Sequence, residues 1–197
     1  MQIDFTHVSE HYAPRTHEKM KEVLMDPTAP GPAIHYYMIR GGTDQKNITV
    51  WEPGTVAGEY IKTYGHYHVG NLSETYWILY GEGIVLLQKM STEPDIVELC
   101  KVIVVHAGDS VHIDSGWGHL AVNTGSTYFV TADDTPVDFS EQQASSMPGH
   151  ADYLPVKNMQ GFAFYVVEQN GKPALKRNLK YKEIKHVDAA GLQIIVK

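Results

Sequence analysis

The 197-residue sequence predicts an all-β sandwich or barrel with a short helix near its N-terminus. Two observations support this fold class. From Ala33 onward the sequence follows a period of two, as in strands that bury one face. Turn residues such as Gly41-Gly42, Pro53-Gly54 and Gly81-Glu82-Gly83 separate these short segments. Many short strands with turns between them are typical of sandwiches and barrels.

A single helix is expected first, at about residues 16–25. Thr16 is a suitable N-cap, and an apolar stripe runs from Met20 to Leu24 before Pro27 ends the helix. The proline-rich connector that follows is incompatible with regular structure. Strands are then expected at 34–40, 47–52, 58–64, 74–80, 84–89, 96–106, 110–113, 118–123, 127–132 and 162–168, with a last one near 192–196.

The chain length suits one domain with a substantial core, and no linker divides it. We expect an N-terminal helix and connector at 1–33, a barrel core at 34–168 and a C-terminal extension at 169–197. Within the core, the polar stretch 133–155 has little pattern. A loop of this length in a compact domain is usually functional, so we expect it to form a wall or lid of a pocket.

Bulk composition argues against several classes of partner. The formal net charge is −7, and no Lys/Arg cluster is long enough for nucleic acid or an anionic membrane surface. The sequence has no apolar run of membrane-spanning length and no signal-peptide pattern at Met1. Its only cysteine, Cys100, excludes an internal disulfide and agrees with a reducing compartment. We therefore expect a cytoplasmic location.

The strongest chemical signal is a set of metal-ligating residue types. His66 and His68 are two positions apart, so in a strand both imidazoles point to the same face. Glu74 opens the next expected strand, and His119 lies at the start of a later one. Three imidazoles and one carboxylate suit a divalent transition ion such as iron, manganese, cobalt, nickel or zinc. Such a set leaves positions open on a six-coordinate ion, which favours a catalytic or ligand-binding role.

These residues lie within two segments that resemble the signature motifs of the cupin superfamily. His66 to Gly81 resembles the first motif, and Gly108 to Asn123 resembles the second. Asp114 stands where the family usually has proline, a difference that concerns the turn and not the ligands. The resemblance implies a cupin jelly-roll barrel, also called a double-stranded β-helix, whose interior has room for one ligand.

Within that superfamily the chain is similar to the cupin-type glucose-6-phosphate isomerases. The likeness rests on Thr63-Tyr64-Gly65-His66-Tyr67-His68, Glu74-Thr75-Tyr76, Trp117-Gly118-His119 and Gly149-His150-Ala151-Asp152-Tyr153. It implies interconversion of glucose 6-phosphate and fructose 6-phosphate, and hence a place in glycolysis and gluconeogenesis. It also implies one divalent metal ion per subunit, Fe2+ first among the candidates, and a homodimer.

The resemblance also assigns individual roles. The residues that match metal ligands are His66, His68, Glu74 and His119, and Glu74 and Tyr76 match the catalytic positions. The residues that match positions in the sugar-phosphate pocket are Thr49, Thr63, Gly65, His150 and Tyr153. Two departures affect this pocket. One extra residue precedes Tyr153, and the strand after the second motif reads Phe129-Val130-Thr131 where the family has a tyrosine.

The same four ligands serve other functions, so alternatives stay open. A cupin dioxygenase uses iron and oxygen on such a site, and a non-catalytic cupin binds sugars without turnover. Isomerisation of another sugar, such as mannose 6-phosphate, is a third possibility. For the aldose-ketose reaction, removal of the C2 proton to give an enediol and a direct hydride shift between C1 and C2 fit the site equally well.

Overall fold

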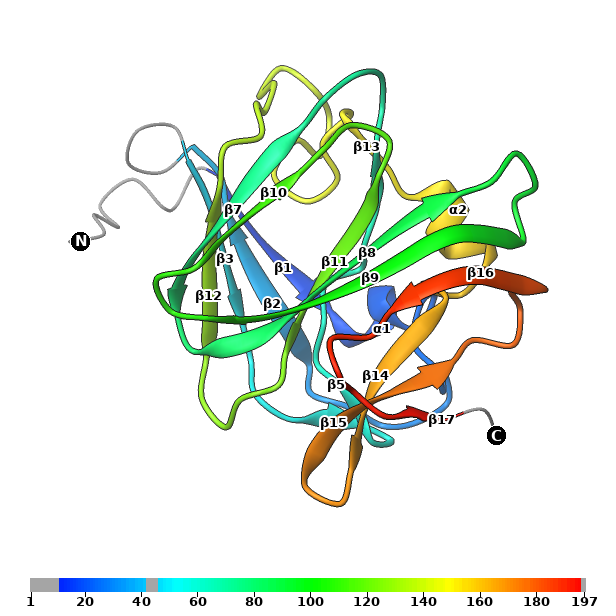
Figure 1. Cartoon of the computed structure of the whole chain (residues 1–197). Helices are drawn as coiled ribbons and strands as arrows, with labels where there is room; N and C mark the ends of the chain where they lie inside the picture. Colours follow the sequence, from blue (N-terminus) through cyan, green and yellow to red (C-terminus); the bar gives the residue numbers. More distant parts are fainter. Residues whose placement is uncertain (1–10, 42–45, 196–197) are drawn as a thin grey trace.

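One wall of the protein is a six-stranded antiparallel sheet (Figure 1). The structure is a computed structural model that describes residues 11–41 and 46–195. The strands of this sheet lie in the order β1-β2-β3-β12-β7-β10. Their bounds are β1 Tyr12–Thr16, β2 Ile34–Ile39, β3 Asn47–Trp51, β12 Phe129–Asp133, β7 Glu74–Tyr80 and β10 Ser110–Ile113.

The second wall is a four-stranded sheet in the order β11-β8-β9-β16. Its bounds are β11 Gly118–Asn123, β8 Glu82–Met90, β9 Ile96–His106 and β16 Glu183–Asp188. The first three strands are antiparallel, and β16 pairs with β9 in parallel. The segment before β6 (Tyr67–His68) joins the β11 edge through bridges between Lys62 and Val122 and between His66 and His119. His66 and His119 are therefore direct neighbours across strands.

The chain crosses repeatedly between these two sheets. It passes from β7 to β8 in the opposite sheet, returns from β9 to β10, and then crosses to β11 and back to β12. Two antiparallel sheets connected in this way form a jelly roll. The predicted all-β cupin jelly-roll barrel with a short N-terminal helix is confirmed.

A third sheet lies beside the barrel in the order β17-β15-β14-β5-β4 (Figure 1). Its bounds are β4 Thr55–Val56, β5 Glu59–Tyr60, β14 Phe164–Gln169, β15 Lys172–Arg177 and β17 Ile194–Ile195. Because β15 pairs with β14 and β16 pairs with β9, the described part of the expected extension packs against the barrel. The division at residues 33 and 168 stays a prediction. Residue 196 of the last expected strand lies outside the described residues.

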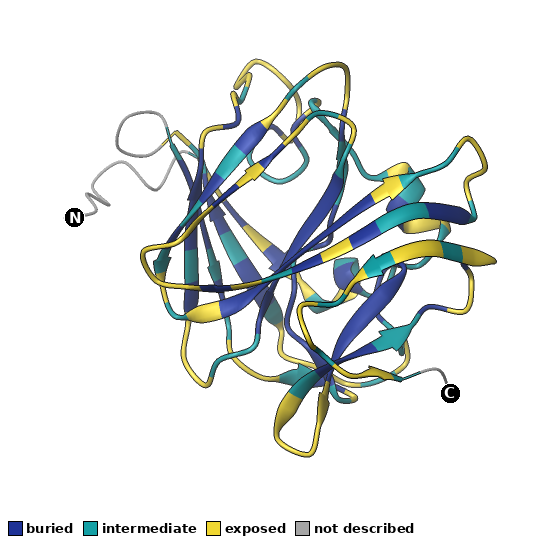
Figure 2. Ribbon diagram, viewed as in Figure 1, coloured by how far each residue is buried: buried dark blue, intermediate teal, exposed yellow. Residues whose placement is uncertain are grey.

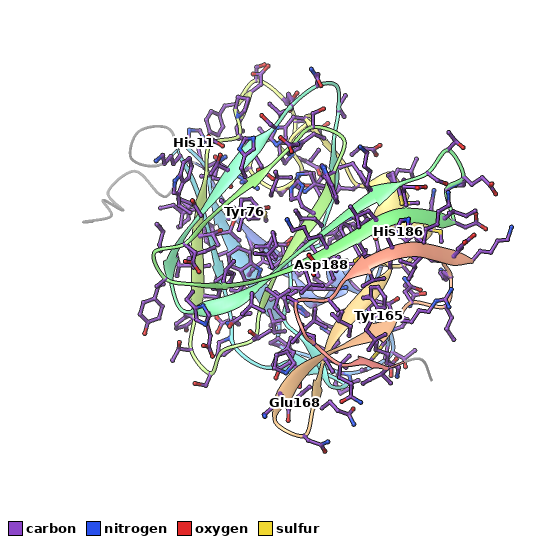
Figure 3. All side chains as sticks on the ribbon, viewed as in Figure 1. His11, Tyr76, Tyr165, Glu168, His186 and Asp188 are labelled. Carbon is purple, nitrogen blue, oxygen red and sulfur yellow. The ribbon has the colours of Figure 1, made fainter. Side chains whose placement is uncertain are left out.

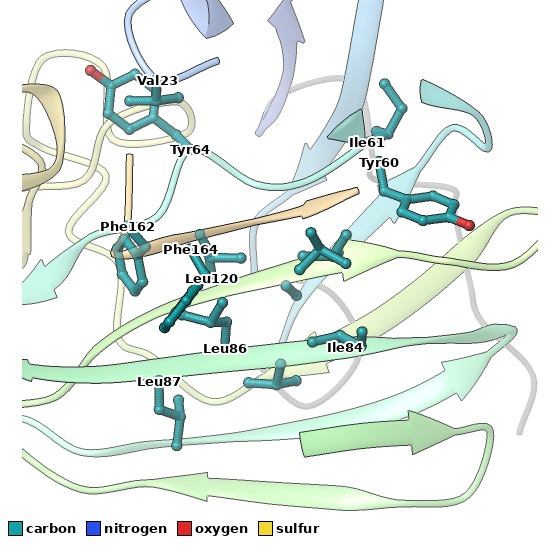
Figure 4. Close-up of a cluster of buried hydrophobic side chains, with 14 of the residues drawn as sticks. Val23, Tyr60, Ile61, Tyr64, Ile84, Leu86, Leu87, Leu120, Phe162 and Phe164 are labelled. Carbon is teal, nitrogen blue, oxygen red and sulfur yellow. The ribbon is translucent and has the colours of Figure 1, made fainter. Parts of the chain in front are cut away.

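One apolar cluster connects the barrel to the segments before and after it. It includes Leu24 from the N-terminal segment, Ile84 and Leu86 from β8, Leu120 from β11, and Phe162. All five are at most 1% exposed. Figure 2 shows the buried strand faces, and Figure 4 shows part of this cluster with Leu86, Leu120 and Phe162 together. Removal of this apolar surface from water stabilises the fold and fixes the strands that carry the site.

The N-terminal helix is shorter than the expected 16–25. Helix α1 covers only His17–Met20, with Thr16 as its N-cap as expected. The backbone that follows is held by side chains from elsewhere. The Lys62 ammonium donates to the carbonyl of Val23, and the Glu59 carboxylate accepts from the amide of Met25. The Glu59 contact replaces the bond that the Met25 amide would make in a longer helix, and the Lys62 contact satisfies a carbonyl that would face Pro27, which has no N–H.

Other elements differ from the sequence prediction by more than a residue or two. Strand β1 and helix α2 (Leu154–Asn158) were not predicted, and neither were β4, β6, β13 (Ala151–Asp152), β15 and β16. The expected strand 58–64 is regular only at β5, after which the chain makes single bridges. The two helices of the described chain, of four and five residues, are far too short to cross a membrane.

Candidate metal centre

Four predicted ligands converge between the sheets. His68 lies in β6, Glu74 opens β7, His119 lies in β11, and His66 is bridged to His119. Each offers one ligand atom, and these four atoms lie within 4.8 Å of one another. His68, Glu74 and His119 are buried, with exposures of 8%, 3% and 0%. The sequence prediction that these four side chains meet at one point is therefore matched by the geometry.

The converging atoms lack ordinary hydrogen-bond partners. Among the described residues, the buried atoms without a partner include Nε2 of His66, His68 and His119, and Oε1 of Glu74. Glu74 Oε1 lies 2.5 Å from His119 Nε2 and 3.6 Å from His68 Nε2. Buried polar atoms nearly always have a hydrogen-bond partner. Four buried lone pairs without one, all directed at the same point, therefore indicate a site for a cation.

A divalent transition ion satisfies this set. Metal bonds to nitrogen and oxygen are about 2.0–2.2 Å long, so two ligand atoms that shared one ion would lie at most about 4.4 Å from each other. The observed maximum of 4.8 Å is close to that spread. The donor chemistry, three imidazoles and one carboxylate, matches the preference of such ions. The residues present therefore fit one metal ion.

The surroundings orient two ligands. The Thr135 hydroxyl donates to Glu74 Oε2 at 2.5 Å, which leaves Oε1 directed at the centre. His68 Nδ1 lies 3.2 Å from the carbonyl of Leu72, so Nδ1 carries the proton and Nε2 has a free lone pair. Outer contacts of this kind fix the tautomer and direction of ligands in metal sites.

The protonation of the site suits a cation. Burial lowers the pKa of His66 well below its ordinary value, and the nearby His119 and His68 add to the effect. Burial opposes ionisation of Glu74, but His119, His68 and the Thr135 hydrogen bond outweigh it, so the pKa of Glu74 is lowered. A neutral imidazole and an ionised carboxylate are the forms that bind metal.

Two of the four ligands, His66 and Glu74, line a cavity whose empty space is about 480 Å³, part of it open to solvent. All five residues expected in the sugar-phosphate pocket line it: Thr49, Thr63, Gly65, His150 and Tyr153. Gly65 has φ of +80°, a conformation that other residues adopt only with strain. The structure brings these five residues together, and their contacts with a substrate stay predictions.

The pairing of β13 with β6 places His150 and Tyr153 beside the ligands. Ala151 is opposite His68, and Asp152 is opposite Tyr67. The His150 ring lies 5.8 Å from the His68 ring, and the Tyr153 ring lies 5.3 Å from the His66 ring. Burial and then the neighbouring His68 lower the pKa of His150 to about 4. The extra residue before Tyr153 does not remove it from the cavity.

Tyr76 follows Glu74 by two residues and shares its face of β7. It is 8% exposed and lines the cavity, and its ring meets the His119 ring edge-on at 5.7 Å. Figure 3 shows Tyr76 inside the barrel. Burial, with the Glu74 and Asp133 carboxylates nearby, raises the pKa of Tyr76 well above its ordinary value. The phenol is therefore protonated and available as a donor.

Sequence reasoning assigned no role to several cavity residues. These are Arg15, Tyr36, Met38, Arg40, Tyr64, Asp133, Thr135 and Pro148. Asp133 accepts from the Asn47 amide at 2.7 Å and lies 3.8 Å from the Arg40 guanidinium. Arg15 lies in the strand that was not predicted. The sequence carries little signal for this strand, because its buried positions are Ala13 and the charged Arg15.

Comparison with known proteins agrees with these motifs. The family model described as glucose-6-phosphate isomerase (GPI) matches residues 36–183. Glucose-6-phosphate isomerase of Thermococcus litoralis is 34% identical over 135 residues, and that of Pyrococcus furiosus is 32% identical over 136 residues. Each alignment covers 68% of this chain, and 62% and 63% of the respective relatives. The chain thus spans less than two thirds of their length.

Solved structures are similar only at a low level. A predicted oxalate decarboxylase from Thermotoga maritima is 18% identical, with a TM-score of 0.42 over 68% of this chain and 96% of that one. The Drosophila melanogaster CENP-C cupin domain is 17% identical, with a TM-score of 0.38 over 53% and 70%. The family match covers most of the barrel, including all four converging side chains. The chain belongs to the glucose-6-phosphate isomerase (GPI) family.

Proposed function

We propose that this chain is a metal-dependent aldose-ketose isomerase that interconverts glucose 6-phosphate and fructose 6-phosphate. One observation carries the proposal. Two of the four converging ligands, His66 and Glu74, line a cavity that is also lined by all five residues that family resemblance places in the sugar-phosphate pocket. Family membership supports the same activity.

His66, His68, Glu74 and His119 would hold one divalent ion, with Fe2+ first among the candidates and Mn2+, Ni2+, Co2+ and Zn2+ as others. When bound, such an ion supplies Lewis-acid chemistry that polarises a carbonyl and stabilises developing negative charge. Three histidines and one carboxylate leave open positions for the oxygens of a sugar.

Glu74 and Tyr76 supply the proton chemistry. The lowered pKa of Glu74 keeps its carboxylate ionised, and the raised pKa of Tyr76 keeps its phenol protonated. Opposite shifts of two neighbouring groups suit an acceptor and a donor. In an enediol route Glu74 would accept the C2 proton while bound to, or displaced from, the metal. Tyr76 would assist proton transfer between O1 and O2 in either route.

A coupled assay tests the activity directly. Fructose 6-phosphate is supplied, and glucose 6-phosphate is detected with and without added divalent metal. Turnover that disappears after chelation and returns with metal supports the proposal. Full activity after exhaustive chelation contradicts the metal requirement, and oxygen consumption without isomerisation indicates a dioxygenase instead. Solvent exchange of a C2 deuterium label favours the enediol route, and retention favours the hydride shift.

We also infer that the protein forms a homodimer and works in the cytoplasm, in glycolysis and gluconeogenesis. Exposed tyrosines support a contact with a second copy, since Tyr12, Tyr80 and Tyr128 are 42%, 54% and 50% exposed. Light scattering of the purified chain measures the mass of the assembly. A monomer at all concentrations contradicts this part of the proposal.

A further inference from the structure

Arg15 is an unusual member of the cavity wall, because its charged side chain is almost fully buried. It lies in β1 and is 3% exposed. Its Nε donates to the Tyr36 hydroxyl at 2.9 Å, and its Nη2 donates to the carbonyl of Ser146 at 2.6 Å. Two bonds from separate parts of the chain hold the guanidinium in one orientation at the cavity.

The charge of Arg15 has no counter-charge in the part of the chain that the structure describes. Its hydrogen bonds there go to the Tyr36 hydroxyl, the Met38 sulfur and a carbonyl, and Nη1 makes none. Two other basic side chains differ, since the buried Lys62 lies 2.7 Å from Glu59, and Arg40, 11% exposed, lies 3.8 Å from Asp133. A buried, unpaired cation costs stability. Such a group is expected where an anionic ligand completes it.

Arg15 is separated from the metal ligands by two tyrosines. The guanidinium carbon lies 5.8 Å from the centre of the Tyr64 ring, which packs edge-on against Tyr153 at 5.4 Å. Tyr153 in turn lies 5.3 Å from the His66 ring. The cavity wall therefore runs from His66, among the predicted metal ligands, through two tyrosines to the Arg15 guanidinium. A ligand that fits both ends is elongated, with adjacent oxygens at one end and an anion at the other.

We infer that Arg15 is the residue that binds the phosphoryl group of the substrate. The inference rests on the proposed function, because a sugar phosphate has its reacting carbons at one end and its phosphate at the other. A planar guanidinium matches phosphate oxygens better than an ammonium group does. The positive charge of Arg15 also explains how a chain with a net charge of −7 can bind an anion, because the attraction is local to the cavity.

A purely structural role for Arg15 makes a different prediction. If Arg15 only held the loop through the Ser146 carbonyl, its loss would weaken every ligand of the cavity alike. If it binds the phosphoryl group, its loss weakens phosphorylated ligands alone. The comparison of a phosphorylated ligand with its unphosphorylated counterpart therefore separates the two roles.

The experiment uses calorimetry on the full chain loaded with Mn2+. The probes are glucitol 6-phosphate, glucitol and inorganic phosphate, and the variants are Arg15→Gln and Arg15→Lys. Arg177→Gln is the matched control, because Arg177 also donates to loop carbonyls, those of Tyr181 and Lys182, but does not line the cavity. Thermal melting verifies that each variant is folded.

Arg15→Gln is expected to lower the affinity for glucitol 6-phosphate by about 10–100-fold, the range for loss of hydrogen bonds to a charged group. Glucitol binding should stay unchanged, Arg15→Lys should fall between Gln and wild type, and Arg177→Gln should match wild type. The inference is overturned if Arg15→Gln lowers the affinity for glucitol and for glucitol 6-phosphate by the same factor. It is also overturned if the affinity for glucitol 6-phosphate does not change. If Arg15→Gln does not fold, Arg15→Lys decides, and unchanged phosphate affinity in that variant overturns the inference.

These results are independent of turnover. A wild-type chain that binds glucitol 6-phosphate but does not isomerise fructose 6-phosphate would end the proposed function, while the Arg15 comparison would still stand. A wild-type chain that isomerises the sugar while Arg15→Gln keeps the wild-type affinity would end the inference alone. Failure of wild type to bind any phosphate probe overturns the inference as well.

Discussion

Thr135 provides a specific test of the metal centre, because it contacts the only carboxylate in the ligand set. Its hydroxyl donates to Glu74 Oε2 at 2.5 Å, and the two residues are 4% and 3% exposed. Thr135→Val removes this donor but keeps the shape of the side chain. Both side chains are buried, so loss of the donor should act directly on the Glu74 carboxylate.

The expected magnitude follows from the charge of the acceptor. A hydrogen bond to a charged group contributes about 1.5–3 kcal/mol. Since each 1.4 kcal/mol is about a factor of ten, metal affinity should fall by about 10–100-fold. The hydrogen bond also helps to lower the pKa of Glu74, so its loss lets protons compete better with the metal. The deficit should therefore grow as the pH falls.

Competition for Mn2+ with a fluorescent chelator measures this effect. Thr135→Ser is the matched control, because it keeps the hydroxyl, and it should bind close to wild type. If folded Thr135→Val binds Mn2+ as tightly as wild type, the hydroxyl does not orient Glu74 toward an ion. Equal losses in both variants would point to packing and not to the hydrogen bond.

Four further outcomes are expected. His119→Ala should lose bound metal, measured by elemental analysis, together with isomerase activity; activity without metal contradicts the ligand role. His150→Ala should mainly raise KM for fructose 6-phosphate in steady-state kinetics, and a fall in kcat alone would argue against a binding role. Glu59→Gln should lower the free energy of unfolding, measured in urea, by about 3–5 kcal/mol, because it leaves Lys62 charged and buried without a counter-charge. The double variant with Lys62→Met should recover part of that loss. Burial, and then the neighbouring His17 and Lys62, lower the pKa of His35 to about 4. The unfolded chain therefore binds a proton at a higher pH than the folded chain, and the free energy of unfolding should fall by up to about 3 kcal/mol as the pH drops from 6.5 to 4. His35→Gln should make the free energy of unfolding less dependent on pH in this range.

Sequence patterns were sufficient for the all-β class and for the pairing of two ligands, whereas the jelly-roll barrel was predicted from the resemblance to cupin motifs. Period-two segments with turns mark the long strands, and H-x-H spacing in a strand directs His66 and His68 to one side. These features depend on local geometry alone. The convergence of His119 with them needed the two motifs, because the contact spans more than fifty residues of chain.

The missed features depend on tertiary contacts. Strands β6 and β13 have two residues each, too few for any periodicity to be visible. In β1 the buried positions are Ala13 and Arg15, a weak apolar signal for a strand. Arg15 is buried only because Tyr36 and the Ser146 carbonyl accept its protons. Helix α1 ends early because barrel side chains bind the backbone after it.

The pairing of β13 with β6 has a thermodynamic consequence. Two short strands join His68 to the loop that carries His150 and Tyr153. An ion that holds His68 in place also favours this pairing, and a sugar that holds the loop favours it from the other side. If both ligands bind as proposed, linkage requires the two effects to be reciprocal: metal would raise the affinity for sugar by the same factor by which sugar would raise the affinity for metal.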